Sequence, residues 1–481
     1  MDVVTKIPAR LDRLPWARWH WLILIGLGSV WILDGLEVTI VGSIGSRLTE
    51  PGSGLGITEA QVGIAASVYI VGACAGALFF GHLTEKYGRR KIFLVTLGVY
   101  LGATVLTAFS GNAAWFYFCR FFTGFGIGGE YAAINSAIDE MVPARLRGRI
   151  SLLINGSYWL GAAVGAALAY PLLNPDLLPE NLGWRLLFGF GGVFGLIIVV
   201  VRRLVPESPR WLIIHGRQEE AERIVSAIEE EVVRETHRDR LPEPQGSLTL
   251  EQRETTTFRE VGRTLARTYP RRTIVGLSLF AGQAFLYNAV FFTQALVLTA
   301  FFGVSSSVAP LYVVPLGLGN FLGPVLLGPL FDTLGRRPMI SGTYIGSGVL
   351  LAVTGVLFHL DLLSAVTLTI CWCVVFFVAS AGASAAYLTV SEVFPMETRP
   401  QAIALFYAVG TALGGIVGPT LFGRLVESGE LSYVALGYYI GAGLMALGGI
   451  VQLAIGIEAA RRSLEDIAQP LSKKKRTTAQ A

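Results

Sequence analysis

Charged residues are scarce in this sequence. Asp, Glu, Lys and Arg together make up 15% of the 481 residues, against about 25% in soluble globular domains. Apolar residues make up 53%, and they gather in runs long enough to cross a lipid bilayer. This composition excludes an ordinary soluble domain and indicates a polytopic membrane protein.

Residues that carry enzyme chemistry are also few. The five His residues are dispersed, and the four Cys residues (Cys74, Cys119, Cys371 and Cys373) all fall in apolar segments. We interpret these Cys residues as small packing residues, neither disulfides nor metal ligands. Because no nucleophile–base set or metal cluster appears, we expect no enzyme activity, no metal and no cofactor. Nothing in the sequence indicates a nucleic-acid partner.

The apolar runs predict an all-α membrane protein with twelve transmembrane helices. Their approximate ranges are 20–45, 60–83, 91–110, 114–138, 150–172, 184–204, 272–301, 307–331, 339–358, 362–390, 401–423 and 433–457. An even number of spans places both termini on one side of the membrane. The basic N-terminus lacks the short apolar run of a signal peptide, so we expect it to remain as a cytoplasmic segment.

A long loop divides the spans into two groups of six. The predicted domains are a cytoplasmic N-terminal segment (1–19), two six-helix halves (20–204 and 271–457), a central cytoplasmic loop (205–270) and a basic cytoplasmic tail (458–481). Within the loop, the charged stretch 218–234 predicts a surface helix under the bundle.

The distribution of basic residues predicts the orientation. All but four of the 38 Lys and Arg residues lie in the two terminal segments and in the loops on the same side as the termini. The exceptions are Arg47, Arg120, Arg185 and Arg424. Cytoplasmic loops carry the excess of Lys and Arg, so both termini are predicted to be cytoplasmic.

The two halves repeat each other in sequence. The loop after the second span, Gly81-His-Leu-Thr-Glu-Lys-Tyr-Gly-Arg-Arg90, recurs after the eighth as Gly328-Pro-Leu-Phe-Asp-Thr-Leu-Gly-Arg-Arg337. A Glu-x-x-Pro-x-x-x-Arg motif likewise follows the fourth and tenth spans. Two six-helix halves in parallel repeat are a transporter architecture. Basic loops also orient helices, but we predict in addition that these residues form a gate, with bridges made only when the cytoplasmic side is closed. The predicted gating residues are Gly81, Glu85, Gly88, Arg89, Arg90, Glu140, Arg147, Asp332, Gly335, Arg336, Arg337, Glu392 and Arg399.

Acidic residues inside the predicted spans are the strongest functional signal. Asp34 and Glu37 lie at i, i+3 in the first span, which places them on one helix face. Arg120 and Glu130 lie in the fourth span, about 15 Å apart along the helix axis, too far to pair with each other. Intramembrane charges are rare and usually functional, although a structural salt bridge is the alternative. Asp34, Glu37, Arg120 and Glu130 are therefore the candidates for proton coupling.

These motifs resemble the major facilitator superfamily over nearly the whole chain. The loop GHLTEKYGRRK is similar to the superfamily's signature loop, with Glu85 in place of the usual Asp. The segments Pro206-Glu-Ser-Pro-Arg-Trp-Leu212, Gly183-Trp-Arg185 and Arg462-Ser-Leu-Glu-Asp-Ile467 resemble the sugar-porter branch. The resemblance implies that Asp34 pairs with Arg120 and that protonation of Asp34 breaks this pair.

The resemblance also implies a substrate site. Asn155, Gln283 and Asn288 fall where sugar porters place sugar-binding amides, and Trp159, Tyr287 and Tyr387 are expected to join them around a central cavity. Packing between helices is an equally good interpretation of Trp159 and Tyr387.

Departures from the sugar-porter pattern concern the substrate. Gly282 and Leu286 replace two residues of the span-seven motif, and Glu37 and Glu130 are additional acids. The segments DGLE and GGEY look more like relatives that carry organic acids, such as the niacin-transporter and synaptic-vesicle-protein-like group.

The predicted function is proton-coupled symport of a small polar metabolite by alternating access. The metabolite is an organic or aromatic acid or a sugar, and the partners are protons and the lipid bilayer of the cell membrane. We expect the protein to act as a monomer. Two alternatives are a sugar facilitator with a static Asp34–Arg120 bridge and a membrane sensor built on a transporter scaffold.

Overall fold

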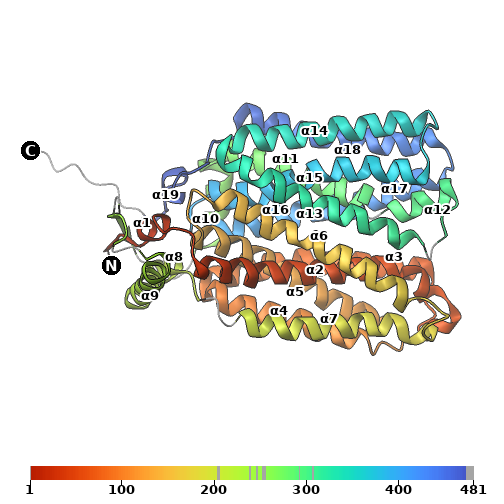
Figure 1. Ribbon diagram of the computed structural model, residues 1–481, viewed down its shortest axis with the longest axis horizontal. Helices are drawn as coiled ribbons and strands as arrows, with labels where there is room; N and C mark the ends of the chain where they lie inside the picture. Colours follow the sequence, from red (N-terminus) through yellow and green to blue (C-terminus); the bar gives the residue numbers. More distant parts are fainter. Residues whose placement is uncertain are drawn as a thin grey trace, which may run out of the picture.

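The computed structural model describes residues 2–202, 206–237, 240–244, 247–251, 256–291, 293–305 and 308–472. Its long helices run side by side in one bundle (Figure 1). Helices α1 (Ile7–Asp12) and α19 (Leu464–Ile467), near the two ends of the chain, lie at the same end of this bundle. We call this end the termini end and the opposite end the far end.

The N-terminal half consists of six long helices. They are α2 (Arg18–Thr49), α3 (Glu59–Tyr87), α4 (Arg89–Thr107), α5 (Ala113–Met141), α6 (Arg147–Leu172) and α7 (Glu180–Arg202). Side-chain caps begin two of them: Thr58 accepts from the backbone N–H of Gln61, and Asn112 accepts from that of Trp115.

The C-terminal half repeats this plan with two interrupted helices. The seventh span consists of α11 (Pro270–Phe285), a π-helical turn η3 (Leu286–Phe291) and α12 (Gln294–Phe302). The eleventh consists of α16 (Arg399–Ala412), a π-helical turn η4 (Leu413–Val417) and α17 (Gly418–Glu427). The uninterrupted spans are α13 (Ala309–Thr333), α14 (Arg336–His359), α15 (Ala365–Val393) and α18 (Leu431–Ile455).

These helices confirm the predicted fold class. Within the described residues, eleven helical stretches are long and apolar enough to cross a membrane. Helix α5, whose composition includes the charged Arg120 and Glu130, is the twelfth. The first residue of the predicted eighth span, at 307, lies outside the described residues. The chain is therefore a membrane protein of two six-helix halves.

The halves meet along two helix pairs, α6 with α13 and α3 with α16. Small residues allow this close approach. A Cβ atom on Gly81 would lie 2.6 Å from the Cβ of Ala404, and one on Gly156 would lie 2.7 Å from the ring of Pro324. Larger residues at these positions would force the halves apart.

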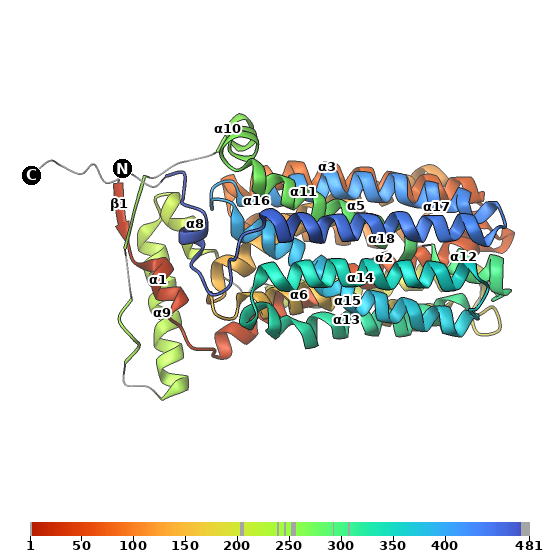
Figure 2. The same cartoon turned by 90° about the horizontal axis from the view of Figure 1, so that it is seen from above.

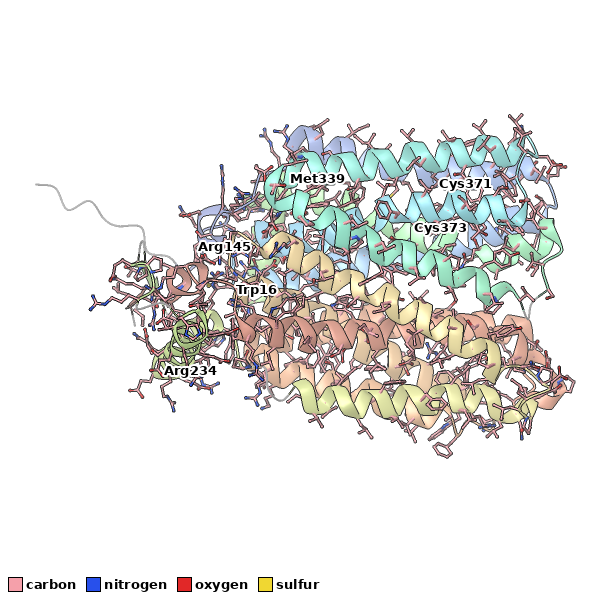
Figure 3. All side chains as sticks on the ribbon, viewed as in Figure 1. Trp16, Arg145, Arg234, Met339, Cys371 and Cys373 are labelled. Atoms are coloured by element: carbon pink, nitrogen blue, oxygen red, sulfur yellow. The ribbon has the colours of Figure 1, made fainter. Side chains whose placement is uncertain are left out.

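A smaller layer covers the termini end. It contains α1, α8 (Pro209–Ile214), α9 (Gln218–Thr236) and α10 (Phe258–Arg263), and α9 runs across the bundle axis (Figure 2). Figure 3 shows Arg145 and Arg234 at this end, whereas Cys371 and Cys373 lie within the bundle. Both the 204/205 boundary and the basic residues from 473 onward lie outside the described residues.

The layer also contains a short two-stranded antiparallel sheet that the sequence analysis did not predict. Strand β1 (Asp2–Thr5) pairs with β2 (Leu248–Glu251). Nearby, Arg10 and Arg13 form ion pairs with Glu229 of α9. Partial burial opposes ionisation of this carboxyl, but the hydrogen bonds from the two guanidinium groups hold the pKa of Glu229 below its ordinary value. The N-terminal segment is thereby fastened to the central loop.

Candidate transport site and gate

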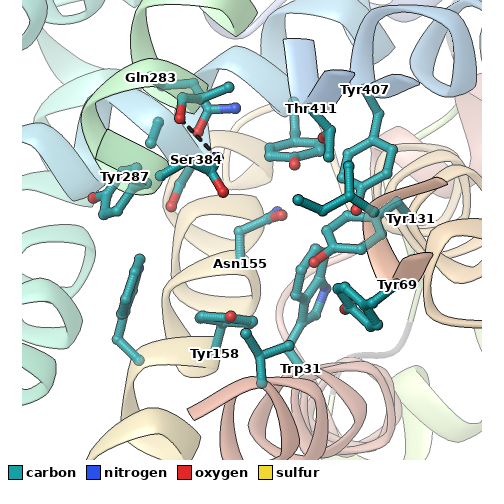
Figure 4. Close-up of a pocket in the computed structure, with 17 residues that line it drawn as sticks. Trp31, Tyr69, Tyr131, Asn155, Tyr158, Gln283, Tyr287, Ser384, Tyr407 and Thr411 are labelled. Carbon is teal, nitrogen blue, oxygen red and sulfur yellow. Dashed lines mark hydrogen bonds between the residues drawn. The ribbon is translucent and has the colours of Figure 1, made fainter. Parts of the chain in front are cut away.

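A cavity of about 160 Å³ lies between the two halves (Figure 4). Both halves contribute to its wall. The lining residues are Trp31, Val38, Tyr69, Ile70, Tyr131, Asn155, Tyr158, Trp159, Gln283, Ala284, Tyr287, Asn288, Ala383, Ser384, Tyr387, Tyr407 and Thr411. All six predicted substrate residues are among them. None of these lining residues is charged.

Aromatic rings dominate this wall. The ring centroids of Tyr131 and Tyr407 are 4.3 Å apart in a stacked arrangement, and Trp31 meets Tyr131 edge-on at 4.5 Å. Tyr387 stacks on Tyr131 at 5.8 Å. Because these contacts join α2 and α5 to α15 and α16, the rings both line the cavity and connect the halves. A flat apolar ring would find several faces to stack on here.

Polar groups at the cavity are only partly satisfied. Asn155 Nδ2 donates to Asn135 Oδ1 at 3.0 Å, while Asn155 Oδ1 is buried without a hydrogen-bond partner among the described residues. The indole Nε1 of Trp31 is likewise buried without a hydrogen-bond partner among the described residues. An unpaired buried polar group is costly, so a ligand that accepts from Trp31 and donates to Asn155 would fit this site.

The predicted amides of span seven reach the cavity in different ways. Gln283 is hydrogen-bonded to the side chain of Tyr387, and Asn288 Nδ2 donates to the carbonyl of Ala284 at 2.8 Å. Both side chains are half-buried. Their remaining donor and acceptor capacity is available to a bound molecule.

Trp159 and Tyr287 form a packed pair at the cavity wall. Their rings stack at 4.8 Å, and the hydroxyl of Tyr287 donates to Asn320 Oδ1 at 2.9 Å. Phe291 meets Trp159 edge-on at 4.8 Å and also lines a second cavity, of about 260 Å³, between α2, α12 and α13. Trp159 therefore takes part in packing and in the cavity wall.

The ion pair expected between Asp34 and Arg120 is absent from the described structure, and this expectation requires correction. Arg120 Nη1 instead donates to Glu37 Oε1 at 3.2 Å, and the hydroxyl of Thr104 donates to Glu37 Oε2 at 2.7 Å. The ring of Tyr69 covers the guanidinium of Arg120, 4.7 Å from its centroid. The reason is register: Glu37 lies one helical turn further along α2, at the level that Arg120 reaches.

Asp34 is buried next to the cavity. Its side chain is 1% exposed, and its Oδ1 has no hydrogen-bond partner among the described residues. Trp31 and Val38, at i−3 and i+4 on the same helix, line the cavity. Spacings of three and four residues share one helix face, so Asp34 lies on the cavity side of α2.

Glu130 takes a different position. It is fully buried on α5 and does not belong to the cavity lining. Tyr100 of α4 lies within electrostatic range of Glu130 and also of Asp34 and Glu37. Glu130 therefore shares the neighbour Tyr100 with Asp34 and Glu37, but it lies on α5 outside the cavity lining.

Two gating residues of the N-terminal half, Arg89 and Glu140, form a buried cluster with Glu207. Arg89 Nη2 donates to Glu140 Oε1 at 2.7 Å. Glu207 accepts from the backbone N–H groups of Arg89 at 2.9 Å and Arg90 at 3.1 Å. Burial raises the pKa of Glu207 although these N–H groups favour its ionised form. Gly88 has a φ of 98°, which only Gly adopts without strain and which turns α3 sharply into α4.

The C-terminal half builds the equivalent cluster. Arg336 binds Glu392 through Nε at 3.0 Å and Nη2 at 3.1 Å. Glu458 accepts from the backbone N–H groups of Arg336 at 2.8 Å and Arg337 at 3.1 Å. Gly335, with a φ of 109°, provides the same turn as Gly88. The repeat seen in the sequence is thus a repeat of contacts.

Three contacts join the two clusters across the halves. Arg399 Nη1 lies 3.5 Å from Glu140 Oε1, and Arg147 Nη1 lies 3.8 Å from Glu392 Oε1. Asp332 accepts from the backbone N–H groups at the start of α6, at 3.0 Å from Gly148 and 2.8 Å from Arg149. The bundle is closed at the termini end in this structure.

Glu85 does not repeat the role of Asp332. Its carboxylate accepts from the amide and hydroxyl of Thr256, in the central loop, at 3.3 and 3.4 Å. Gln401 Nε2 of α16 donates to the carbonyl of Thr256 at 3.3 Å. The link between the halves therefore passes through the loop at this position.

Sequence reasoning missed a large part of the cavity wall. The additional polar or aromatic residues are Trp31, Tyr69, Tyr131, Tyr158, Ser384, Tyr407 and Thr411. The helical spacing of Trp31 from Asp34, and the position of Tyr131 beside Glu130, were the available signals. Tyr and Trp are common on any face of a membrane helix, so these signals alone did not separate cavity from packing.

Comparisons with known proteins agree with this architecture. The chain is 27% identical to the niacin transporter of Acinetobacter baylyi over 420 residues, which cover 87% of this chain and 89% of the relative. It is 26% identical to the 4-hydroxybenzoate transporter of the same organism, with coverage of 86% and 88%. Its fold superposes on a proton:xylose symporter bound to 6-bromo-6-deoxy-D-glucose with a TM-score of 0.76, at 19% identity, covering 93% of this chain and 98% of that one.

A family model confirms the resemblance seen in the sequence. The model described as sugar (and other) transporter matches residues 41–471, from the second part of α2 to the end of the C-terminal half, and this range includes both gate clusters and most of the cavity lining. The chain therefore belongs to the sugar (and other) transporter family of the major facilitator superfamily, and it is a multi-pass membrane protein of a family of small-molecule transporters.

Proposed function

We propose that this protein is a proton-coupled symporter of a small aromatic acid in the cell membrane. The observation that carries the proposal is the position of Asp34. Its carboxyl is buried on the cavity side of α2, and the available counter-charge, Arg120, is engaged by Glu37. A buried carboxyl without a counter-charge is costly when ionised, so its protonation changes the energy of the closed cavity.

Asp34 is the proton carrier in this proposal. It takes up a proton while the cavity is in contact with the more acidic side, and the neutral carboxyl then allows the cavity to close. Glu37 keeps Arg120 neutralised throughout the cycle. This division replaces the bridge-breaking scheme inferred from sugar porters, in which Asp34 and Arg120 separate.

The aromatic wall supports an aromatic substrate. Tyr131, Tyr387 and Tyr407 supply ring faces, while Trp31 Nε1 and Asn155 Oδ1 offer one unused donor and one unused acceptor. A carboxyl group on a ring with a hydroxyl or ring N–H matches this pattern. The named substrates of two relatives, niacin and 4-hydroxybenzoate, are aromatic acids, and the second of them also has the hydroxyl donor.

The closed gate supports access from the far end. With the termini end sealed by contacts of Arg399 and Asp332, a substrate reaches the cavity from the side opposite the termini. The excess of Lys and Arg near the termini supports a cytoplasmic location for that end. Because protons enter the cell down their gradient, symport with protons makes the direction of transport in this proposal into the cell.

Uptake into proteoliposomes tests the proposal. Nicotinate, 4-hydroxybenzoate and xylose are offered separately, with and without an inward pH gradient. We expect an aromatic acid to accumulate only with the gradient and xylose not to accumulate. Equal uptake with and without the gradient would contradict proton coupling and indicate a facilitator. Accumulation of xylose alone would contradict the proposal that the substrate is aromatic.

A pair of substitutions at one position sharpens the substrate part. Trp31→Phe keeps a ring in the wall but removes the indole N–H, whereas Trp31→Leu removes both. If the N–H binds the substrate carboxylate, Trp31→Phe weakens binding of nicotinate but not of 3-methylpyridine, in which a methyl group replaces the carboxylate. Equal loss for both ligands would assign Trp31 to stacking alone.

A further inference from the structure

Asp139 lies near the termini end of α5, immediately before the gating residue Glu140. In the internal repeat, the offset of 252 that relates Glu140 to Glu392 relates Asp139 to Ser391. The structure brings these two equivalent positions into direct contact, because the hydroxyl of Ser391 donates to Asp139 Oδ2. This contact therefore lies where the two halves meet.

The surroundings of Asp139 are fully enclosed. Its side chain is 0% exposed, and its Oδ1 has no hydrogen-bond partner among the described residues. The charged groups that face it are Glu392 from α15, Arg147 from α6, Arg399 from α16 and Arg210 from α8. The adjacent residue on its own helix is Glu140.

The arginines around Asp139 are already neutralised by other acids. Five buried arginines and five acids form a network of ion pairs in this region, in which several arginines share an acid. The arginines are Arg89, Arg147, Arg210, Arg336 and Arg399, and the acids are Asp12, Glu140, Asp332, Glu392 and Glu465. Asp139 is a sixth acid. An ionised carboxylate here would be a surplus negative charge close to Glu392 and removed from water, which is costly.

We propose that Asp139 is a second proton-binding site, which holds a proton while the gate is closed and releases it to the termini side when the gate opens. The inference rests on the alternating access of the proposed function. Separation of the halves removes Ser391 from Asp139 and admits water, and the hydrated carboxyl then ionises. Closing the gate again requires that the proton return, because the ionised form cannot be buried beside Glu392 without cost.

This proton differs from the one assigned to Asp34. The Asp139 proton leaves to the termini side and is taken up from the same side, so it does not cross the membrane and adds nothing to the transport stoichiometry. Its effect is on the gate equilibrium. Low pH on the termini side favours the closed gate, and high pH favours the open gate.

Distance measurements across the termini end test this proposal without any substrate. Spin labels are attached at Lys91 on α4 and Leu334 between α13 and α14, both exposed, in a chain whose four cysteines are replaced by alanine. For the parent protein we expect the ratio of closed to open gate to fall by about tenfold between pH 5 and pH 8. The second proton is isolated in an Asp34→Asn background, which removes the effect of the proposed proton carrier on the same equilibrium. In that background Asp139→Asn should keep the ratio constant within about twofold over the same range.

Two control variants complete the experiment. Asp34→Asn alone should retain a pH response of the gate, because Asp139 is intact in this variant. Ser391→Ala should lower the closed fraction at every pH while retaining the response, since it removes a hydrogen bond but no titratable group. A parent protein without a pH response, or a double variant with Asp34→Asn and Asp139→Asn that keeps it, would overturn the proposal. If Asp34→Asn alone abolishes the response, the gate assignment is wrong and the proposed symport by Asp34 stands.

Discussion

The two halves of the molecule share one helix plan but differ in the chemistry that they bring to the centre. The N-terminal half contains Asp34, Glu37 and Arg120, all buried near the cavity. The C-terminal half faces the same cavity with the uncharged Gln283 and Asn288. This difference indicates that the first half handles charge, and the proton in our proposal, while both halves supply neutral hydrogen-bonding groups for a substrate.

The two halves also differ in how their gate clusters are linked to the opposite half. Asp332 accepts directly from the N–H groups of Gly148 and Arg149 at the start of α6. In the internal repeat, the start of α16 corresponds to the start of α6, and Pro400 occupies the position equivalent to Gly148. Pro has no backbone N–H to donate. Glu85 is accordingly bound to Thr256 instead. One side of the gate is thus a direct link between halves, and the other depends on the central loop.

The largest expected effect separates the two acids of α2. Asp34→Asn should abolish substrate accumulation driven by a pH gradient while leaving exchange across the membrane intact, because the variant cannot bind or release the coupling proton. Proteoliposome accumulation and counterflow measure the two activities. Glu37→Gln is the matched control and should retain accumulation. Full accumulation by Asp34→Asn would contradict the division of roles between the halves.

The next effect compares the two gate acids. Asp332→Asn weakens two backbone contacts and an ion pair with Arg336, and hydrogen bonds to charged groups contribute about 1.5–3 kcal/mol each. We expect at least about a tenfold shift toward the open gate. Glu85→Gln, which affects longer contacts to the neutral Thr256, should shift it by less than about threefold. Distance measurements across the termini end report the open fraction of both variants. Equal shifts in the two variants would contradict the proposed difference between the two gate acids.

A smaller effect concerns the neutral side of the cavity. Gln283→Ala and Asn288→Ala should each weaken substrate binding by about 1–3 kcal/mol, the usual loss when a buried hydrogen-bond partner is removed. Equilibrium binding to the purified protein provides the measurement. Gln452→Leu, at a buried amide of α18 outside the cavity lining, is the control. Unchanged affinity in both variants would move the substrate site away from the C-terminal half.

The smallest effect comes from making the gate more symmetric. The double substitution Glu85→Asp with Pro400→Gly gives the N-terminal cluster the residue types of the C-terminal one, including an N–H at position 400. We expect the closed gate to gain less than about 1 kcal/mol, because the contact to Thr256 is lost in exchange. The same distance measurement, compared with Pro400→Gly alone, shows whether the new link forms.

The sequence predicted features that depend on one helix or on the internal repeat. The apolar runs located the spans. The internal repeat predicted that Arg89 and Arg336 occupy equivalent positions in the two halves. Features that depend on how helices rotate and slide against each other were not predicted. The partner of Arg120 changed from Asp34 to Glu37 because one helical turn of register decides which carboxyl it reaches. The pairing of β1 with β2 was missed because neighbouring residues carry no signal for so distant a partner.

The small sheet at the termini end has a consequence for the order of assembly. Strand β1 can form only after β2, about 245 residues later, has left the ribosome. At the usual synthesis rates of 5–20 residues per second, the first strand waits roughly 10–50 s. During this interval the first six helices enter the membrane without the layer that later covers them, and Arg147 has neither Glu392 nor Arg462 available. The cover is therefore completed only when about half of the 481 residues have been synthesised. The first half must remain stable in the membrane before its closing contacts exist.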